Sequence, residues 1–454
     1  MKKIISLFAA FIFSMAAMAQ TLAGSWTGKL QVGAAQLTIV FNITENGSGG
    51  YACTLDSPDQ GVKGLPASIT VSEGTKVKIS LAQLMASYEG ELKDGIMEGT
   101  FTQGGMSFTL DMKPGTAEVN RPQTPKPPYP YTTEDVTFTS AAGNATLSGT
   151  LTCPVGYADM QKEDVPVVVM VTGSGLQNRD EEVFGHKPFL VLADYLARNG
   201  IATLRYDDRG AGKSTGNTAD MTTETNMTDA QAAVDFVRST GKFGPVGVLG
   251  HSEGGAIAFM LGARGKADFV ISMAGQGVSG DSILISQNRI TMKQAGVPEN
   301  VTAAYCAALK SVLVSIAGGT AGQSPEETVA AAVRSAGGNL PPGASANLVK
   351  VIQTASPWMK YFIAYDPSAD IKAVKCPVMA VNGEKDVQVI AAENLPAIQR
   401  LLPADSLNMV KEYAGLNHLF QHCTTGAVTE YRQIEETMSP EVMQDIAAWI
   451  HKVN

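Results

Sequence analysis

The sequence predicts an α/β protein: an eight-stranded, mostly parallel sheet flanked by helices, with a helical cap inserted into it and a small all-β domain in front. Three observations predict this fold class. From residue 134 onward, continuous apolar runs alternate with helical segments, as in parallel sheets buried on both faces. A helix-rich stretch at 281–370 interrupts that alternation. Residues 20–112 show instead short segments of alternating polarity, separated by turn residues.

The composition bounds the kind of protein. The chain has 454 residues, 44% hydrophobic and 17% charged, so its length is typical of two domains and it has enough apolar material for a large core. The formal net charge is -9. Because a nucleic-acid binder needs a basic face to displace counterions from phosphates, we expect no nucleic-acid partner. The 5 cysteines are scattered and odd in number, which argues against a disulfide framework.

Residues 1–19 have the organisation of a secretory signal peptide. Lys2 and Lys3 precede an apolar stretch, and Ala17 and Ala19 are small residues at the positions that a signal peptidase recognises. The apolar stretch is shorter than the roughly 20 residues that a membrane-spanning helix needs. We therefore expect cleavage after Ala19, no transmembrane anchor in the cleaved chain, and export to the periplasm or the extracellular space.

Residues 20–112 are expected to form a small all-β domain, either a lipocalin-like barrel or a sandwich. Segments such as "QLTIVFNIT" and "KVKISL" alternate with Gly, Asn and Asp turns, and the opening "GSWTGKL" resembles the start of lipocalin-like barrels. A proline-rich linker follows at 113–133, because clustered prolines favour an extended, stiff segment. A β module on such a spacer could contact a glycan, a lipid or the cell envelope.

Residues 134–454 make up the second predicted domain. The hairpin "DVTFTSAAGNATLSGTLTCPV" and six later apolar runs give eight strands. Helical segments lie between the runs, and Thr228 is the expected N-cap of the helix in "TDAQAAVDFVRST". Because open α/β sheets bind ligands at the carboxyl ends of their strands, the helix-rich stretch 281–370 is expected to be a cap over a binding site there.

The stretch "VGVLGHSEGGAIAFM", residues 246–260, carries the strongest chemical pattern. It places Gly-x-Ser-x-Gly, Gly250 to Gly254, directly after a strand and before a helix, which is the context of a nucleophile elbow. The turn is so sharp that only hydrogen fits at the two flanking positions. Ser252 is therefore the predicted nucleophile. The alternative is an ordinary strand-to-helix turn, since the five-residue pattern alone is common by chance.

A serine nucleophile needs a base and an acid that orients it, and in a sheet of this kind they follow in the order Ser, acid, His. Asp386 ends "PVMAVNGEKD", immediately after the seventh predicted strand, and is the predicted acid; the alternative is that it caps a turn. His418, in the loop after the eighth strand, is the predicted base. His422 competes with it four residues later, whereas His451 falls in the final helix.

The oxyanion of an acyl-transfer intermediate needs amide donors. The backbone N–H of Glu253 is one predicted donor. The other is that of Ser174, in "TGSGLQNRDE", where Gly173 and Gly175 let the backbone approach a ligand; a plain glycine-rich turn is the alternative. The stretch "YDDRGAGKSTG" mimics the end of a phosphate loop but has Asp207 where the first glycine is required, so nucleotide binding is rejected. The 5 dispersed histidines predict no metal site.

From about residue 134 to its end, the chain resembles the α/β-hydrolase superfamily with a helical cap. The stretches "GSGLQNRDE", "RYDDRGAGKS", "GHSEGG", "SPWMKYFIAYDP", "NGEKDVQV" and "GLNHLFQ" are similar to those of secreted bacterial esterases grouped with serine aminopeptidases. The resemblance implies hydrolysis of carboxylic esters without metal or cofactor, through Ser252, Asp386 and His418. The chain departs from many relatives in having Thr172-Gly173 instead of His-Gly in the oxyanion loop.

Three hypotheses about function follow. The first is an exported serine hydrolase that takes small-molecule esters under its cap. The second keeps the same three residues but takes a peptide with a free N-terminus, whose ammonium would need a carboxylate such as Glu181, Glu182, Glu326 or Glu327. The third is a glycan-, lipid- or partner-binding protein in which hydrolysis is secondary.

Overall fold

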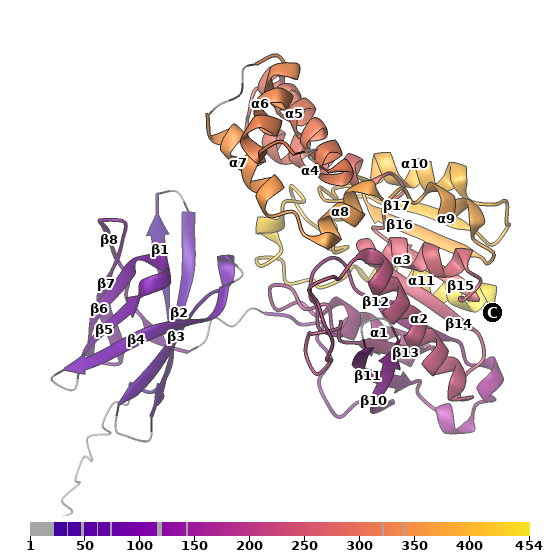
Figure 1. Cartoon of the computed structure of the whole chain (residues 1–454). Helices are drawn as coiled ribbons and strands as arrows, with labels where there is room; N and C mark the ends of the chain where they lie inside the picture. Colours follow the sequence, from indigo (N-terminus) through magenta and orange to yellow (C-terminus); the bar gives the residue numbers. More distant parts are fainter. Residues whose placement is uncertain are drawn as a thin grey trace, which may run out of the picture. The chain divides into compact units, whose positions relative to one another are not determined.

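The computed structural model describes residues 22–454, except 34, 47–49, 61, 73–74, 116–119, 142–143, 320–321, 339 and 341. The signal peptide expected at 1–19 lies outside these residues. The chain divides into two compact units, 1–119 and 120–454, both drawn in Figure 1. The linker expected at 113–133 is thus shared between them, since residues 113–114 pair as a strand in the first unit.

The first unit is an antiparallel nine-stranded meander whose two edges meet. The strands lie in the order β8-β7-β6-β5-β4-β3-β2-β1-β9. Met112, just before β9, bridges to Met97 in β7, and β9 pairs with β1, so the sheet closes on itself. The strands are β1 (Gly24–Val32), β2 (Ala35–Glu45), β3 (Tyr51–Ser57), β4 (Val62–Ser72), β5 (Lys76–Leu81), β6 (Ala86–Lys93), β7 (Ile96–Gln103), β8 (Met106–Thr109) and β9 (Lys113–Pro114).

Inward-facing side chains fill the first unit, because alternate residues of each strand point to the same face. Trp26, Phe41 and Tyr88 are all buried there. The Trp26 indole N–H donates to the carbonyl of Leu22 at 2.9 Å, and the Tyr88 hydroxyl donates to that of Met97 at 2.9 Å, so both polar groups are satisfied inside the core. The expected all-β character of this part of the chain is confirmed.

The second unit is built on an eight-stranded sheet in the order β10-β11-β13-β12-β14-β15-β16-β17. β10 and β11 form an antiparallel hairpin that pairs antiparallel with β13, and all the other pairings are parallel. The predicted eight-stranded, mostly parallel sheet is therefore confirmed. Its strands are β10 (Thr132–Ser140), β11 (Ala145–Cys153), β12 (Val167–Val171), β13 (Ala202–Tyr206), β14 (Val246–His251), β15 (Phe269–Met273), β16 (Val378–Gly383) and β17 (Met409–Tyr413).

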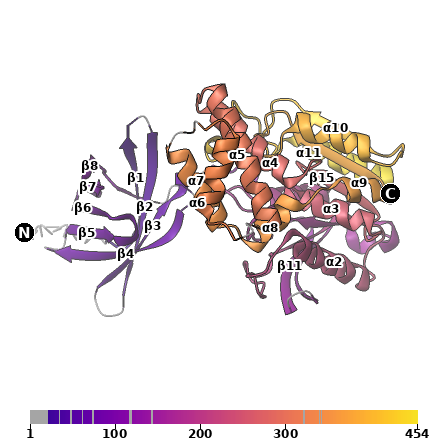
Figure 2. The same cartoon turned by 45° about the horizontal axis from the view of Figure 1, so that its top comes forward.

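Helices cover both faces of this sheet (Figures 1 and 2). α1 and α11 bury their apolar residues on one face, and α2, α3, α9 and α10 bury theirs on the other. Every residue of β12 and β14 is buried, as the continuous apolar runs predict. These helices are α1 (Pro188–Arg198), α2 (Thr223–Ser239), α3 (Glu253–Ala263), α9 (Ser368–Ala373), α10 (Ala391–Leu401) and α11 (Pro440–Val453).

The N-cap predicted for α2 is wrong. The helix begins at Thr223, and Thr222 is its N-cap: the backbone there is extended, and the Thr222 hydroxyl accepts from the Thr225 amide. The Thr225 hydroxyl bonds back to the Thr222 amide at 2.8 Å, which completes a capping box. Thr228 lies inside the helix, where its hydroxyl donates to the Glu224 carbonyl.

The helix-rich stretch between β15 and β16 forms the predicted cap. Figure 2 shows its helices grouped together, and they have a small apolar core of their own. Among the described helices, α5 alone has the length and apolar composition of a membrane span, but its buried face packs inside this cap core. The cap helices are α4 (Gly280–Gln294), α5 (Glu299–Gly318), α6 (Pro325–Ser335), α7 (Pro342–Gln353) and α8 (Pro357–Ala364).

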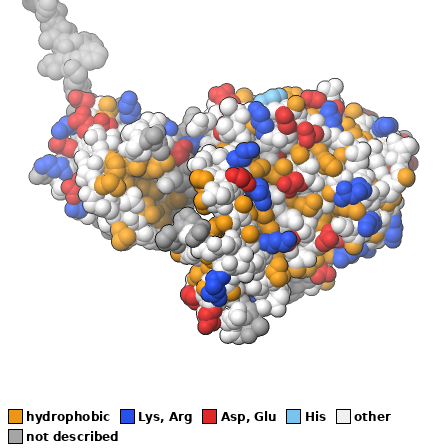
Figure 3. Space-filling view, turned by 90° about the horizontal axis from the view of Figure 1, so that it is seen from above, with side chains coloured by type: hydrophobic (Ala, Val, Ile, Leu, Met, Phe, Trp, Pro, Cys, Tyr) orange, Lys and Arg blue, Asp and Glu red, His pale blue; other side chains and the backbone are white. Residues whose placement is uncertain are grey.

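Residues 120–131 are anchored to the second unit. The Arg121 guanidinium donates to the backbone carbonyls of Ile434, Phe184 and Arg432 at 2.7, 2.8 and 2.9 Å. Gln123 adds a bond to the Met438 carbonyl. This half of the proline-rich segment is therefore part of the second unit and not a free spacer. On the face of that unit seen in Figure 3, acidic and basic side chains are interspersed.

Candidate active site

The predicted nucleophile lies on a strained turn between β14 and α3. Ser252 has φ 54 and ψ −118, a backbone conformation that residues other than glycine rarely adopt. Its amide donates to the Met273 carbonyl at 2.9 Å, and its carbonyl accepts from the Gly255 amide at 2.9 Å. These bonds hold the strained residue between the end of β15 and the first turn of α3. The sharp strand-to-helix turn expected at this position is present.

The flanking glycines are there because the backbone comes too close for any side chain. A Cβ on Gly250 would lie 1.8 Å from the Gly254 carbonyl oxygen. A Cβ on Gly254 would lie 2.2 Å from the Val171 carbonyl oxygen of β12. Neither glycine has a positive φ, so the requirement is for space and not for backbone freedom.

The predicted acid and base meet although 32 residues separate them. Nδ1 of His418 lies 2.7 Å from Oδ2 of Asp386, and both side chains are buried. The second carboxylate oxygen of Asp386 accepts from the amides of Gln388 and Val389 at 2.7 and 2.9 Å. Asp386 therefore caps a turn with one carboxylate oxygen and contacts His418 with the other.

The competing residues lie elsewhere. His422 is exposed, and its Nδ1 pairs with Glu436 at 2.8 Å. His451 is exposed in α11. Two other aspartates in this part of the chain have partners of their own: Asp370 accepts from the Tyr365 hydroxyl, and Asp405 accepts from the Leu407 amide.

Ser252, His418, Ser174 and Glu253 all line one pocket of about 400 Å³. The pocket lies under the cap: α4 contributes Ile283, Leu284 and Gln287, and α8 contributes Trp358 and Phe362. The loops after β12, β14, β16 and β17 form its other walls. The predicted site residues thus converge at the carboxyl ends of parallel strands, as Asp386 reaches the pocket through His418.

Numbered along the chain, the strands lie across the sheet in the order 1-2-4-3-5-6-7-8. The turn with the predicted nucleophile follows the fifth strand, the predicted acid follows the seventh, and the predicted base follows the eighth. This order and these positions define one fold family. Residues 120–454 have the α/β-hydrolase fold.

Comparisons with known proteins agree with this fold. Residues 187–279 match the family model described as serine aminopeptidase, S33. The chain is similar to esterase EstD of Thermotoga maritima, with 23% identity over 306 residues, 67% of this chain and 66% of the relative. It therefore spans slightly less than two thirds of that curated relative.

Two solved structures are similar to this chain. The esterase PF2001 of Pyrococcus furiosus is 16% identical, with a TM-score of 0.43, and the match covers 75% of this chain and 98% of that one. Est1E of Butyrivibrio proteoclasticus is 15% identical, with a TM-score of 0.38, over 70% of this chain and 98% of that one.

The oxyanion loop of the hydrolase domain, residues 172–178, approaches the nucleophile closely. A Cβ on Gly173 would lie 3.1 Å from the Ser252 Cβ. The Gly173 amide donates to Oε1 of the buried Glu181 at 2.8 Å. This amide is thus engaged within the protein, and the oxyanion donor predicted from this loop is the next one along, Ser174. The same Glu181 oxygen lies 2.9 Å from Nδ1 of His251, the residue before the nucleophile.

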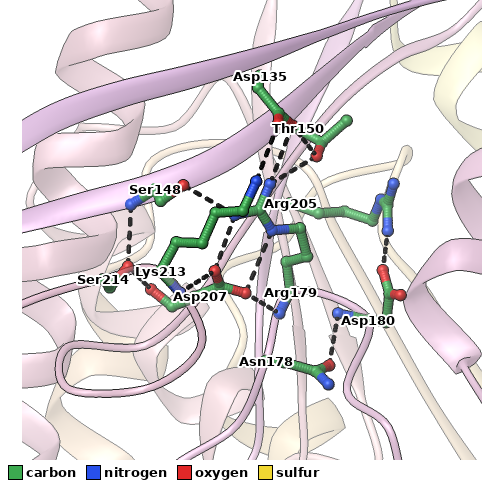
Figure 4. A network of polar contacts seen from close by, with 10 residues as sticks. All are labelled: Asp135, Ser148, Thr150, Asn178, Arg179, Asp180, Arg205, Asp207, Lys213 and Ser214. Atoms are coloured by element: carbon green, nitrogen blue, oxygen red, sulfur yellow. Dashed lines mark hydrogen bonds and ion pairs between the residues drawn. The ribbon is translucent and has the colours of Figure 1, made fainter.

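A polar network fixes the segment that follows this loop (Figure 4). Arg179 donates through its backbone and its guanidinium to the buried carboxylate of Asp207 at 2.8 Å, and also to the hydroxyls of Ser148 and Thr150. Asp207 accepts in addition from the Lys213 amide. The stretch that mimics a phosphate loop therefore anchors the oxyanion segment to the sheet.

Asp208 ties both ends of the oxyanion loop. Its carboxylate accepts from the Thr172 hydroxyl at 2.7 Å and from the Gln177 amide at 2.9 Å. Burial raises the pKa of Asp208 to about 7, and the neighbouring carboxylates of Glu181 and Glu253 add to this rise. The loop is therefore held by a carboxyl group that titrates near neutrality.

The cap is connected to the catalytic turn through Glu253. Its buried carboxylate accepts from the indole N–H of Trp358, at 2.9 Å from each oxygen. Glu253 is thus the first residue of α3 and at the same time the anchor of α8. Among the residues that the structure describes, no group of His, Cys, Asp and Glu is arranged to hold a metal ion.

The sequence reasoning missed four residues: His251, Asp208, the side chain of Glu253, and Trp358. Each acts through a partner that is distant in the chain, as Glu253 and Trp358 do across 105 positions. For His251 and Asp208, the sequence pattern that could have indicated them is a charged or polar residue at the end of an apolar strand run, where burial requires a partner.

The close backbone packing around Gly250 predicts a large loss of stability when a single methyl group is added there. Gly250→Ala should destabilise the hydrolase domain by about 3 kcal/mol or more, because the new methyl group would overlap a backbone carbonyl that cannot move alone. Gly343→Ala in α7, where a Cβ meets nothing within 4 Å, is the matched control and should change stability little. Urea unfolding of the two variants measures the difference; equal stabilities would contradict the geometry.

The raised pKa of Asp208 predicts a pH-dependent stability. The folded protein keeps this carboxyl protonated in a range where the unfolded chain has lost the proton, so its contribution to stability falls as the pH rises from about 4 to about 7. Asp208→Asn should therefore gain stability relative to wild type between about pH 5 and about pH 8, measured by urea unfolding. Asp235→Asn, at an exposed carboxylate of α2, controls for the loss of one charge. A stability difference that does not change with pH would refute the assignment.

Proposed function

We propose that this chain is an exported serine hydrolase that cleaves carboxylic esters of small or medium size. The observation that carries the proposal is the Asp386–His418 pair, whose histidine lines the same pocket as the strained Ser252. A buried carboxylate held against one ring nitrogen of a histidine leaves the other nitrogen to act on a serine hydroxyl. The likeness to an esterase of Thermotoga maritima supports the same chemistry.

In the proposed mechanism, His418 takes the proton of the Ser252 hydroxyl as its oxygen attacks the ester carbonyl carbon. Asp386 orients the ring and stabilises the imidazolium that forms. The amides of Glu253 and Ser174 donate to the oxyanion of the tetrahedral intermediate. The intermediate collapses to an acyl-enzyme as His418 protonates the leaving alkoxide. Water then attacks the acyl-enzyme with His418 again as the base, which releases the carboxylic acid and regenerates Ser252.

The pocket supports an ester substrate of limited size. Its apolar wall, formed by Ile283, Trp358 and Phe362, suits an acyl or alkyl chain, and its volume of about 400 Å³ lies at the small end of ligand sites. Gln276 also lines the pocket, and within the described structure its buried amide nitrogen has no hydrogen-bond partner. That nitrogen could donate to a second oxygen of the substrate.

An aminopeptidase is the second candidate, favoured by the family match over residues 187–279. A substrate ammonium would need a carboxylate with free acceptor capacity in the pocket. Glu181 is bound to Gly173 and His251, and Glu253 to Trp358. Glu327 caps α6, and Glu326 is exposed beside it. Of the four carboxylates considered for this role, only Glu182 remains as a candidate, and it lies at the pocket wall. Because the other three are engaged or exposed, we favour the ester as substrate.

For the first unit, we propose that it binds a glycan, a lipid or the cell envelope, because it is a separate all-β fold. Binding as the main function, with hydrolysis secondary, is the third candidate. A pull-down of glycan, lipid and envelope fractions with the full chain and with residues 120–454 would test the contribution of this unit. If the full chain and residues 120–454 are retained equally, the first unit does not contribute to binding and the third candidate is excluded.

The proposed activity predicts a specific loss. Ser252→Ala should lower the hydrolysis of p-nitrophenyl acetate and butyrate by roughly 10⁶-fold, because the nucleophile is lost, and Asp386→Asn should lower it by roughly 10⁴-fold. His422→Asn, at the exposed histidine, is the control and should keep full activity. Equal activity of Ser252→Ala and wild type would exclude the proposal. Turnover of aminoacyl arylamides without ester turnover would favour the peptidase.

Export predicts a shortened mature chain. Cleavage after Ala19 should leave Gln20 as the first residue, because the small side chains of Ala17 and Ala19 fit the signal peptidase. N-terminal sequencing of the protein recovered from the periplasmic and extracellular fractions measures this. Ala19→Arg should block the cleavage. An uncleaved wild-type chain in the cytoplasmic fraction would contradict export.

A further inference from the structure

His251, the residue before the nucleophile, lies between two hydrogen-bond acceptors. Its Nε2 is 2.9 Å from the backbone carbonyl oxygen of His418, and its Nδ1 is 2.9 Å from Oε1 of Glu181. A carbonyl oxygen can only accept, so Nε2 must carry a hydrogen. The side chain is buried, so water cannot substitute for either partner.

The Glu181 side requires a second hydrogen on the same ring. Oε1 of Glu181 already accepts from the Gly173 amide at 2.8 Å, and this contact identifies Oε1 as an acceptor. Protonation of Glu181 on its other oxygen would not change this. A protonated Oε1 could instead donate to Nδ1, but a carboxylic hydroxyl oxygen is a poorer acceptor for the Gly173 amide than a carboxylate oxygen. We therefore assign Oε1 as a carboxylate oxygen and Nδ1 of His251 as a second donor. A neutral imidazole has one N–H and one lone pair, so it would point a lone pair at an oxygen on one side.

The charges around the ring are consistent with a cation. Burial by itself lowers the pKa of His251, but the Glu181 carboxylate, the hydrogen bond to it, the His418 carbonyl and the more distant Asp386 raise it, and the net shift is upward. The other carboxyl groups nearby are Asp208 and Glu253, and Asp208 interacts with both Glu181 and Glu253. The other titratable ring beside His251 is that of His418; the two ring centroids lie 4.7 Å apart.

We propose that His251 is a fixed imidazolium, paired with Glu181, that holds the nucleophile, the oxyanion loop and the catalytic histidine in register. This inference rests on the proposed esterase mechanism. Both residues are positioning residues. Glu181 reaches the oxyanion loop at Gly173, His251 is bonded covalently to Ser252, and its Nε2–H holds the backbone of His418. One ion pair therefore connects three loops that come from different strands.

The charge has a consequence that simple packing would not have. Glu181→Gln keeps the shape of the side chain but removes the negative charge that favours the imidazolium, so the pKa of His251 should fall in this variant. Above that lowered pKa the ring loses one N–H, and either the bond to residue 181 or the bond to the His418 carbonyl is lost. The activity of Glu181→Gln should therefore fall as the pH rises, in a range where the wild type remains active.

The first test reads the protonation state directly and does not depend on activity. Long-range ¹H–¹⁵N spectra of the full chain labelled on histidine resolve 5 rings, and His251→Asn assigns the one in question. At about pH 8, more than one unit above the ordinary histidine pKa of about 6.5, the His251 ring should still show the imidazolium pattern. In Glu181→Gln it should titrate at a lower pH. A neutral tautomer of His251 in the wild type at this pH would overturn the proposal.

The second test reads the catalytic consequence. The ratio of kcat/KM between wild type and Glu181→Gln should grow at least tenfold from about pH 6 to about pH 8.5. Glu326→Gln, an exposed charge removal in the cap, should follow the wild-type profile. A pH-independent loss in Glu181→Gln would overturn the positioning role, since a merely structural defect acts at every pH. If no ester is hydrolysed, the proposed function fails while the spectra still decide the state of His251; if Glu181→Gln does not fold, the wild-type spectra decide it.

Discussion

The candidate active site depends on how closely three pieces of backbone approach one another beside Ser252. The turn after β14 passes so near to its own helix and to β12 that Gly250 and Gly254 have no room for a Cβ atom. The same approach brings Gly173 of the oxyanion loop against the Ser252 side chain. Close backbone contact of this kind fixes the positions of the backbone amides near Ser252 without the use of flexible side chains.

Several carboxyl groups with little or no exposure lie near Ser252. Glu181, Asp208, Glu253 and Asp386 all lie near the pocket, and each is held by hydrogen bonds to a partner from another element. A buried carboxylate is costly unless its hydrogen bonds are satisfied. Each of these groups therefore connects two elements that could otherwise separate, and the elevated pKa of Asp208 reflects their mutual repulsion as well as burial. The cap belongs to the same system, because Trp358 bonds to the residue that follows the nucleophile.

Much of the site could be predicted from local patterns. Gly-x-Ser-x-Gly predicted the sharp strand-to-helix turn at Ser252, and the order of strands predicted the loops on which Asp386 and His418 meet. The sequence did not decide between His418 and His422. The two lie four positions apart in one loop, and an irregular loop gives no periodicity that shows which side chain points toward the site. The start of α2 was placed wrongly, since Thr222 and Thr228 are both plausible N-caps and only the capping box with Thr225 distinguishes them. The proline-rich stretch indicated a spacer, but it did not show that Arg121 would find three carbonyls on the second unit.

The sequence by itself determined the fold class and the sharp turn at Ser252, because strand burial and the Gly-x-Ser-x-Gly pattern are local features of consecutive residues. The tertiary structure decided the pairings: Asp386 with His418, Glu181 with His251 and Gly173, and Glu253 with Trp358. These contacts join residues 8 to 105 positions apart, and their existence depends on which loops the sheet brings to one edge. Hydrogen-bond acceptors and charges placed there determine protonation states, and no pattern in the chain alone specifies them.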